Sequence, residues 1–233
     1  MALKKKVLWL TVGLVGVMLT AGNCALAEIT GSAHDLSMGT SGTNTIYSSD
    51  QQEICVFCHT PHNALKNDSI PLWNHELSTQ TYGVYGSPTF DGTDIAEIGG
   101  ADETTATVSN LCMSCHDGTI AINSFENNSN TWPTTTMVGT DAGDVMPALS
   151  SANLGTNLGD DHPVNFTYDT TLATTDGSLV DPTDAVGSGL TNAKLFNSKL
   201  QCASCHDPHD TTNPTFLRAS MDGSGLCKEC HTK

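Results

Sequence analysis

Eight cysteines of the sequence stand in four pairs, and each pair has two residues between its members and a histidine directly after it. Two cysteines at this spacing on a tight turn reach the two vinyl groups of one porphyrin, and the histidine then meets the iron. We therefore expect four covalently bound haem c groups, with thioether bonds from Cys55, Cys58, Cys112, Cys115, Cys202, Cys205, Cys227 and Cys230. The expected proximal iron ligands are His59, His116, His206 and His231.

Other functions of these motifs are disfavoured. Disulfides or zinc sites would use the same cysteines, but the number of CxxCH matches expected by chance is on the order of 0.01. A haem enzyme needs an iron with an open position and acid or base groups facing the substrate. No motif has its histidine replaced, and the histidines are in surplus. We therefore expect an electron carrier with no catalytic residues.

Five histidines outside the motifs are candidates for the distal face of each iron, and five candidates for four positions favour bis-His ligation. A His/Met scheme, which would raise the reduction potential, would draw on Met38, Met137, Met146 or Met221. The five candidate histidines are His34, His62, His75, His162 and His209.

An internal repeat separates these five candidates. Each half of the chain has one upstream histidine, a CxxCH motif with another histidine three residues after it, and then a second CxxCH motif. The histidines that occur in both halves are His34, His62, His162 and His209, which are the expected distal ligands. His75 has no counterpart and is the weaker candidate.

His62 and His209 each follow a proximal histidine by three residues, which is too close to cross that residue's own porphyrin. If they bind iron, each binds a different haem, so two irons are neighbours. Numbering the haems by motif order, the simplest assignment sends His62 to the second haem and His209 to the fourth. Alternatively, Pro61 and Pro208 only fix turns with an exposed histidine.

The first 27 residues have a basic start, an apolar run and a small-x-small end, which is typical of a signal peptide that is removed. Three of the nine Lys and Arg lie there, so residues 28–233 carry six against 25 Asp and Glu, a net charge near −19. This charge excludes nucleic acid and anionic membranes as partners. No other long apolar segment is present, so we expect no transmembrane segment and a periplasmic or extracellular protein. Cys24 could carry a lipid anchor, but a small residue should precede a lipidated cysteine and Asn23 stands there. We therefore expect Cys24 to be removed with the signal peptide.

The composition predicts a core that side chains alone do not fill. Charged residues are 15% and aromatic residues 6% of the chain, while small polar residues are abundant throughout. We expect a multihaem cytochrome fold that the haems organise, with mostly irregular loops, short helices at the CxxCH sites and little or no sheet. A helical turn is expected over residues 193–199, and irregular loops over 127–136 and 167–191. Residues 28–130, with the N-terminal arm, and 131–233 each hold one haem pair of one continuous unit.

Several short stretches resemble a known group. They are HDLS at 34–37, CHTPHNA at 58–64, LWN at 72–74, CHDGT at 115–119, DHPV at 161–164 and CHDPH at 205–209. These stretches resemble the doubled-CxxCH multihaem cytochromes of metal-reducing bacteria, over nearly all of residues 30–233. The chain is similar in particular to outer-surface cytochromes whose subunits stack into extracellular filaments, or nanowires, with a continuous haem chain. The resemblance implies that all four haems are bis-His ligated and that one axial histidine comes from the neighbouring subunit.

Two functions follow for electron transport. In the first, the protein is secreted and forms a head-to-tail polymer that carries electrons to extracellular acceptors or other redox cytochromes. His34 lies in a Gly/Ser/Thr-rich arm and the last motif ends two residues before Lys233, so His34 could complete a haem of the next subunit. Coordination of His34 within its own chain is equally compatible with the sequence. In the second, the protein is a monomeric periplasmic or surface shuttle whose acidic surface steers it to a basic partner.

Overall fold

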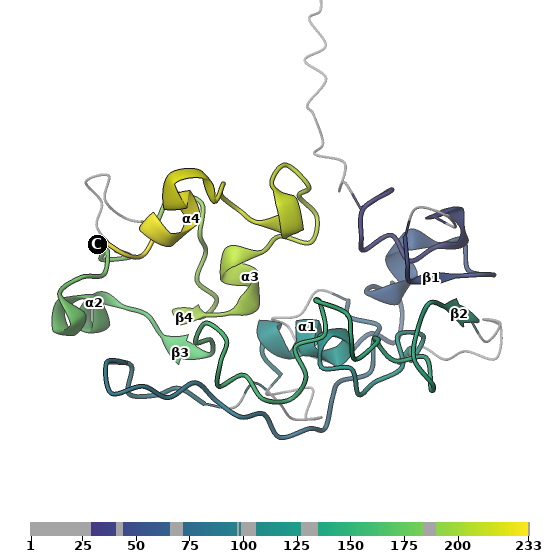
Figure 1. The fold of residues 1–233 in the computed structure, drawn as a ribbon, viewed down its shortest axis with the longest axis horizontal. Helices are drawn as coiled ribbons and strands as arrows, with labels where there is room; N and C mark the ends of the chain where they lie inside the picture. The colour runs from purple at the N-terminus through teal and green to yellow at the C-terminus, as the bar shows by residue number, and fades with distance from the viewer. Residues whose placement is uncertain are drawn as a thin grey trace, which may run out of the picture.

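The computed structural model describes residues 29–40, 44–65, 72–96, 98, 106–126, 135–183 and 190–232. The expected signal peptide and Cys24 lie outside these residues, as does most of the expected loop at 127–136. The described chain forms an elongated body (Figure 1). Strands β1 (Tyr47–Ser48) and β2 (Met137–Val138) lie at one end, and helices α2 (Thr170–Asp176) and α4 (Gly225–Lys228) lie at the other.

Between these ends lie the other helices and the second strand pair. Helices α1 (Val108–His116) and α3 (Cys202–Cys205) lie near the middle, next to strands β3 (Phe166–Thr167) and β4 (Lys199–Leu200). The remaining helical elements are 3₁₀ turns at Met38–Thr40, Ile54–Phe57, Pro214–Phe216 and Asp222–Ser224. Short helices, two small sheets and long irregular connections agree with the loop-rich architecture expected from the composition.

Each of the two sheets is a single antiparallel pair. Tyr47 of β1 stands opposite Val138 of β2, and Phe166 of β3 stands opposite Leu200 of β4. The first pair joins the N-terminal arm to a segment beyond residue 130. The arm that carries His34 is therefore tied to both halves of the sequence.

Gly139 allows this first strand pair to close. Its φ is +80°, a conformation that side chains with a Cβ rarely adopt. A Cβ built at this position would lie 1.7 Å from the carbonyl oxygen of Thr45. Glycine is therefore required here both for its backbone conformation and for the close approach of the arm.

Helix α2 falls in a region that was expected to be an irregular loop, so that expectation is wrong. The side chain of Asp169 caps the helix by accepting a hydrogen bond from the Leu172 amide at 2.9 Å. Gly177 ends the helix in the left-handed conformation, with φ of +69°. Leu172 and Ala173 are buried, which anchors this otherwise threonine-rich helix.

The helical turn expected over residues 193–199 is also absent. Instead, Asn197 and Ser198 have positive φ values of 51° and 60°. The amides and carbonyls of Phe196 and Lys199 exchange hydrogen bonds of 3.0 and 2.9 Å across them. This is a two-residue hairpin turn of the type I′ kind, and it leads directly into β4.

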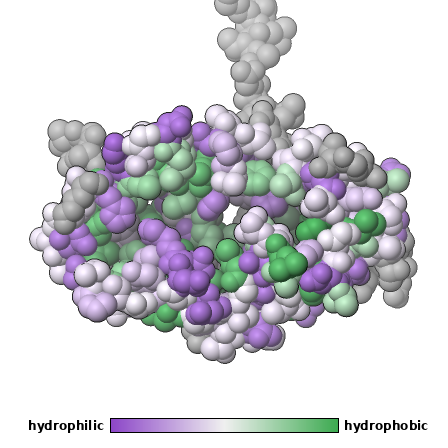
Figure 2. Space-filling view, in the orientation of Figure 1, coloured by the Kyte–Doolittle hydropathy of each residue, from purple (hydrophilic) through white to green (hydrophobic). Residues whose placement is uncertain are grey.

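The core is divided into small parts. In the part of the chain that the structure describes, nearly all buried apolar side chains fall into four separate clusters, and the two largest hold five buried residues each. The two largest pack around Phe57 and Ile122 and around Phe166 and Tyr168. Figure 2 shows the molecule hollowed along its middle, with apolar side chains beside the openings. The polypeptide by itself therefore leaves space between its clusters.

Candidate haem-binding sites

All four CxxCH motifs lie on helical turns, as expected. The first motif begins in the 3₁₀ turn Ile54–Phe57, the second ends α1, the third forms α3 and the fourth begins on α4. In three motifs the proximal histidine's amide donates to the carbonyl of the first cysteine. These distances are 2.8 Å for His59, 3.1 Å for His206 and 2.9 Å for His231. All eight motif cysteines are unpaired, so the turns hold two free thiols and an imidazole each.

Three proximal histidines face a second imidazole ring. The ring centroids are 6.0 Å apart for His34 and His116, 6.0 Å for His59 and His209, and 6.4 Å for His162 and His231. Two metal–imidazole bonds of about 2 Å each, plus about 1 Å from each nitrogen to its ring centre, give a separation of about 6 Å. Each pair therefore has the spacing of two axial ligands of one iron.

Hydrogen bonds orient several of these rings. The Nδ1 atoms of His116, His162 and His206 lie 2.7, 3.0 and 2.8 Å from the carbonyl oxygens of Ala152, Pro163 and Thr215. Because a carbonyl oxygen only accepts, each Nδ1 carries the proton and donates. The lone pair is then on Nε2, which is the arrangement that metal-bound histidines show when their other nitrogen is hydrogen-bonded.

Burial favours the neutral form of the His34 and His116 rings. Burial lowers the pKa of His34 to about 4, and the nearby rings of His116, His209 and His206 lower it further. Burial also lowers the pKa of His116, against the hydrogen bond to Ala152. Neutral imidazole is the form that binds a metal, so the environment of this pair favours ligation.

The lowered pKa of His34 predicts a loss of stability in acid. An unfolded His34 takes up a proton near pH 6.5, whereas the folded one resists until about pH 4. In the chain without haem, where no iron holds the His34 ring, the free energy of unfolding should therefore fall by about 3 kcal/mol as the pH falls from 6.5 to 4, and this contribution is constant below that range. Denaturant unfolding of that chain across this range measures the change. A His34→Met variant has a side chain that does not titrate there, and should lack this part of the pH dependence. An equally steep pH dependence in the variant would contradict the assignment to His34.

The two motifs that have a histidine three residues later adopt the same hairpin. In each, the amide of the residue after the proximal histidine donates a hydrogen bond to a carbonyl of the returning segment. The amide two residues after that carbonyl's residue then donates to the carbonyl of the motif's second cysteine. The bonds are Thr60 to Leu72 at 2.9 Å, Asn74 to Cys58 at 2.9 Å, Asp207 to Phe216 at 2.7 Å and Arg218 to Cys205 at 2.8 Å. The repeat in the sequence is therefore also a repeat of local structure.

His209 lies in the hairpin of the third motif, and its ring lies beside His59 in the hairpin of the first motif. Its ring lies 6.0 Å from the ring of His59, and the two ring planes make an angle of 18°. The simplest sequence assignment sent His209 to the fourth haem, but His162 occupies the face of His231. The structure thus brings the first and third motifs together, which the order of residues along the chain did not suggest.

His62 and His206 are left without a facing ring. Both are exposed, and among the described residues neither makes a ring contact. The sequence assignment of His62 to the second haem is not reproduced, because His34 lies against His116. Of the four proximal histidines, His206 is therefore the one that faces no second ring in the described residues.

His34 lies within its own chain. Its ring is 6.0 Å from that of His116 and stacks on Phe216 at 4.4 Å. The expectation that His34 reaches a neighbouring subunit is not favoured by this arrangement. The N-terminal arm is instead folded back onto the body.

His75 is fully buried and faces no proximal histidine. Its Nδ1 lies 3.0 Å from the Glu76 carbonyl oxygen, and its Nε2 lies 3.5 Å from the Sγ of Cys115. It thus contacts an attachment cysteine and not the far side of a proximal ring. This position fits its place in the sequence, where it has no repeat counterpart.

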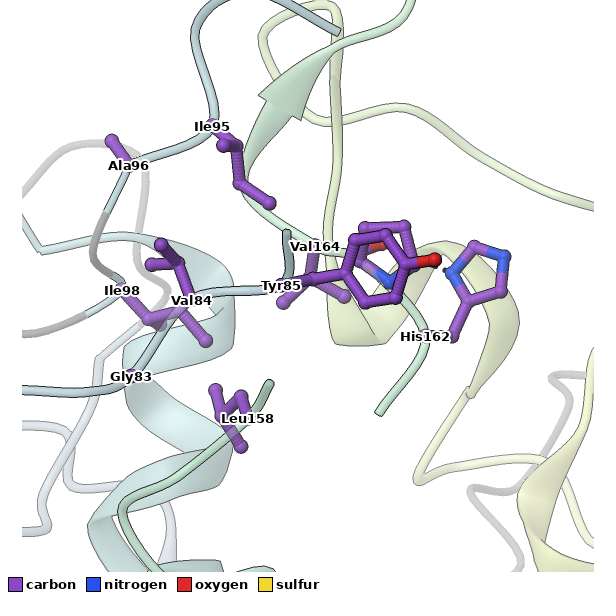
Figure 3. Close-up of a pocket in the computed structure, with 10 residues that line it drawn as sticks. Gly83, Val84, Tyr85, Ile95, Ala96, Ile98, Leu158, His162 and Val164 are labelled. Atoms are coloured by element: carbon purple, nitrogen blue, oxygen red, sulfur yellow. Dashed lines mark hydrogen bonds between the residues drawn. The ribbon is translucent and has the colours of Figure 1, made fainter. Parts of the chain in front are cut away.

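Two further features lie beside the paired histidines. A pocket beside His162 has an apolar wall that includes Val84, Ile98 and Leu158, with the imidazole at its edge (Figure 3). The indole N–H of Trp73 is buried without a hydrogen-bond partner, although its ring lies 6.2 Å from that of His59. A buried donor without a partner suits an acidic group of a bound cofactor, such as a haem propionate.

Residues 194–233 match the family model for the doubled CXXCH motif. The matched segment contains the third and fourth motifs. No curated protein matches the chain. Together with the four motifs, the match supports a multihaem c-type cytochrome with covalently bound haem c, and points to haem-based electron transfer of the generally non-catalytic kind. No helix in the described ranges is both long and apolar enough to cross a bilayer.

Proposed function

We propose that this protein transfers electrons through four c-type haems with histidine on both faces of each iron. The observation that carries this proposal is the set of three facing imidazole pairs, at 6.0 to 6.4 Å between ring centroids. Each pair combines one histidine from a CxxCH motif with one from outside the motifs.

The haems supply reversible one-electron oxidation and reduction, and the chain supplies position and environment. Two strong-field imidazoles on an iron leave no position for a substrate, which is why we propose a carrier and not an enzyme. The proposed ligand set contains no methionine, and negative charge near a haem stabilises the ferric form. Low midpoint potentials follow, spread over the four unlike environments.

We further propose that the protein is secreted and works as the subunit of an extracellular filament that carries electrons to external acceptors. His206 lacks a facing ring, while His62 is an exposed histidine of the equivalent hairpin. If His62 of one subunit binds the third haem of the next, the contact is head to tail, and it builds a fibre where the rotation between subunits does not close a ring. The other partners would be redox cytochromes at the cell surface.

The charge of the chain opposes this association. Subunits with a net charge near −19 repel one another, and salt screens that repulsion. A coordination bond between subunits is a short-range interaction that salt does not weaken in the same way. Filament assembly should therefore be favoured at higher ionic strength.

Electron microscopy of the holoprotein recovered from outside the cells tests the proposal. The wild type is expected to form uniform filaments with four low-spin haems per subunit, and His62→Ala is expected to abolish them and leave one haem in four high-spin. His62→Met, which keeps a ligand, should restore assembly. Discrete wild-type particles with four low-spin haems at all salt concentrations would instead establish a monomeric shuttle in which His62 binds within its own chain.

A further inference from the structure

Helices α1 and α3 are joined by a buried polar contact at Ser109. Its hydroxyl donates to Oε1 of Gln201 and accepts a hydrogen bond of 3.0 Å from the Cys202 amide. Ser109 is 0% exposed and Gln201 is 3% exposed. Ser109 lies one helical turn before Cys112, so the contact forms on the face of α1 that carries this cysteine.

The contact continues from Gln201 through Asn165 back to the first half of the chain. The Gln201 side-chain amide donates to Oδ1 of Asn165 at 3.0 Å, and Asn165 donates to the Ala96 carbonyl at 3.1 Å. The Gln201 backbone amide donates to the Ser204 hydroxyl at 2.8 Å, which caps α3. We call Ser109, Gln201 and Asn165 the α1–α3 clamp. A fully satisfied buried network of this kind holds its members in one arrangement.

The clamp brings the first cysteines of the second and third motifs together. A hydrogen bond with the Cys202 side chain is the largest cause that raises the pKa of the Cys112 thiol. Electrostatic contacts also relate Cys58 to Cys115 and Cys230 to Cys205. The attachment cysteines of the second and third motifs therefore lie close together, and the clamp lies at this junction. The first motif meets the third separately, through His59 and His209.

We propose that Ser109 and Gln201 are positioning residues that set the separation of the second and third haems, a junction through which electrons would pass between the two halves of the chain. The inference rests on the proposed function and names the residues that control one step of it. In this step one electron moves from a ferrous to a ferric iron, and no bond forms or breaks and no proton is required. Because electron tunnelling weakens steeply with the distance between haem edges, a loosened clamp slows this step.

Circular dichroism of the Soret band tests the proposal, because neighbouring haems give a bisignate signal whose amplitude depends on their separation and angle. Ser109→Ala and Gln201→Ala are compared with wild-type holoprotein, each checked for four low-spin haems. Ser48→Ala is the matched control, because Ser48 is equally buried and its hydroxyl bonds Asp50 and the Gln51 amide. We expect a loss of couplet amplitude in both clamp variants and none in the control, while melting temperatures fall similarly in the two serine variants.

Three results would overturn the proposal. The couplet could remain at wild-type amplitude in both clamp variants, which would make the clamp structural only. It could fall equally in Ser48→Ala, which would remove the specificity. A clamp variant with fewer than four haems would show a role in haem attachment and not in spacing. Failure of the proposed function is distinguished from all of these, because it would appear in the wild type as fewer than four bis-His haems.

Discussion

Replacing His209 by alanine is expected to convert one haem in four from low spin to high spin. The ring of His209 lies 6.0 Å from that of His59, so it is the proposed distal ligand of the first haem. Arg218 supports this loop by donating to Asp207 at 2.8 Å, and Asp207 in turn accepts from the His209 amide at 3.1 Å. Loss of the imidazole leaves one iron five-coordinate while three keep both ligands. Electron paramagnetic resonance of the ferric protein separates the two spin states.

Two comparisons sharpen this result. His209→Met should keep all four haems low-spin and raise the midpoint potential of one of them, because a thioether ligand favours the ferrous iron. His75→Asn should leave four low-spin haems, since His75 faces no proximal ring. A high-spin haem in His75→Asn, with none in His209→Ala, would reverse the two roles.

Replacing Gly139 by alanine is expected to destabilise the holoprotein by about 3 kcal/mol or more. The added Cβ would lie 1.7 Å from the Thr45 carbonyl oxygen, so β1 and β2 must separate. The arm that carries His34 is attached through this strand pair, and its ligation to the second haem should weaken together with the pairing. Denaturant unfolding gives the free energy, and the fraction of high-spin haem reports on His34.

Gly143→Ala is the matched control for this substitution. Its φ of +89° is as unfavourable for alanine, but nothing lies within 4 Å of the added Cβ. The expected cost is therefore only the backbone strain, about 1 kcal/mol, with no high-spin haem. Equal costs for the two variants would mean that the arm moves away freely and that the close approach at Thr45 has no energetic weight.

The attachment sites were predictable because their chemistry is local. A CxxCH motif contains both thiols and the proximal imidazole within five residues, and the helical turn that presents them is equally local. The structure accordingly places all four motifs on helical turns. The loop-rich character also followed from the sequence, because small polar residues cannot bury enough area for a large core.

The pairing of distal histidines was not predictable in the same way. His209 meets His59 across about 150 residues of chain, and this depends on how the third motif packs on the first. The repeat identified His209 as a candidate ligand but carried no information on its iron. The residue type and the repeat identify a candidate ligand, whereas the iron that it binds depends on the tertiary fold.

Two local features were missed although the sequence contained their signals. A short threonine-rich run lies between Asp169 and Gly177. Asp169 is a typical N-cap and Gly177 a typical C-terminal residue, so the two mark the ends of a helix. Asn197 and Ser198 tolerate the positive φ that a type I′ hairpin requires. Both signals were hidden by the abundance of Ser, Thr and Asn, which makes caps and turns common throughout this chain.

Among the described residues the core is divided into four small clusters, so under the proposed ligation stability and redox function would draw on the same bonds. The proposed axial ligands join segments that apolar packing leaves separate, such as the N-terminal arm with α1 and the first motif with the third. Maturation of the chain would then be complete only once its irons are bound, as in small proteins that fold around a metal. A cell short of haem would accumulate a chain open to proteolysis, and the abundance of the carrier would follow haem supply without a dedicated regulator.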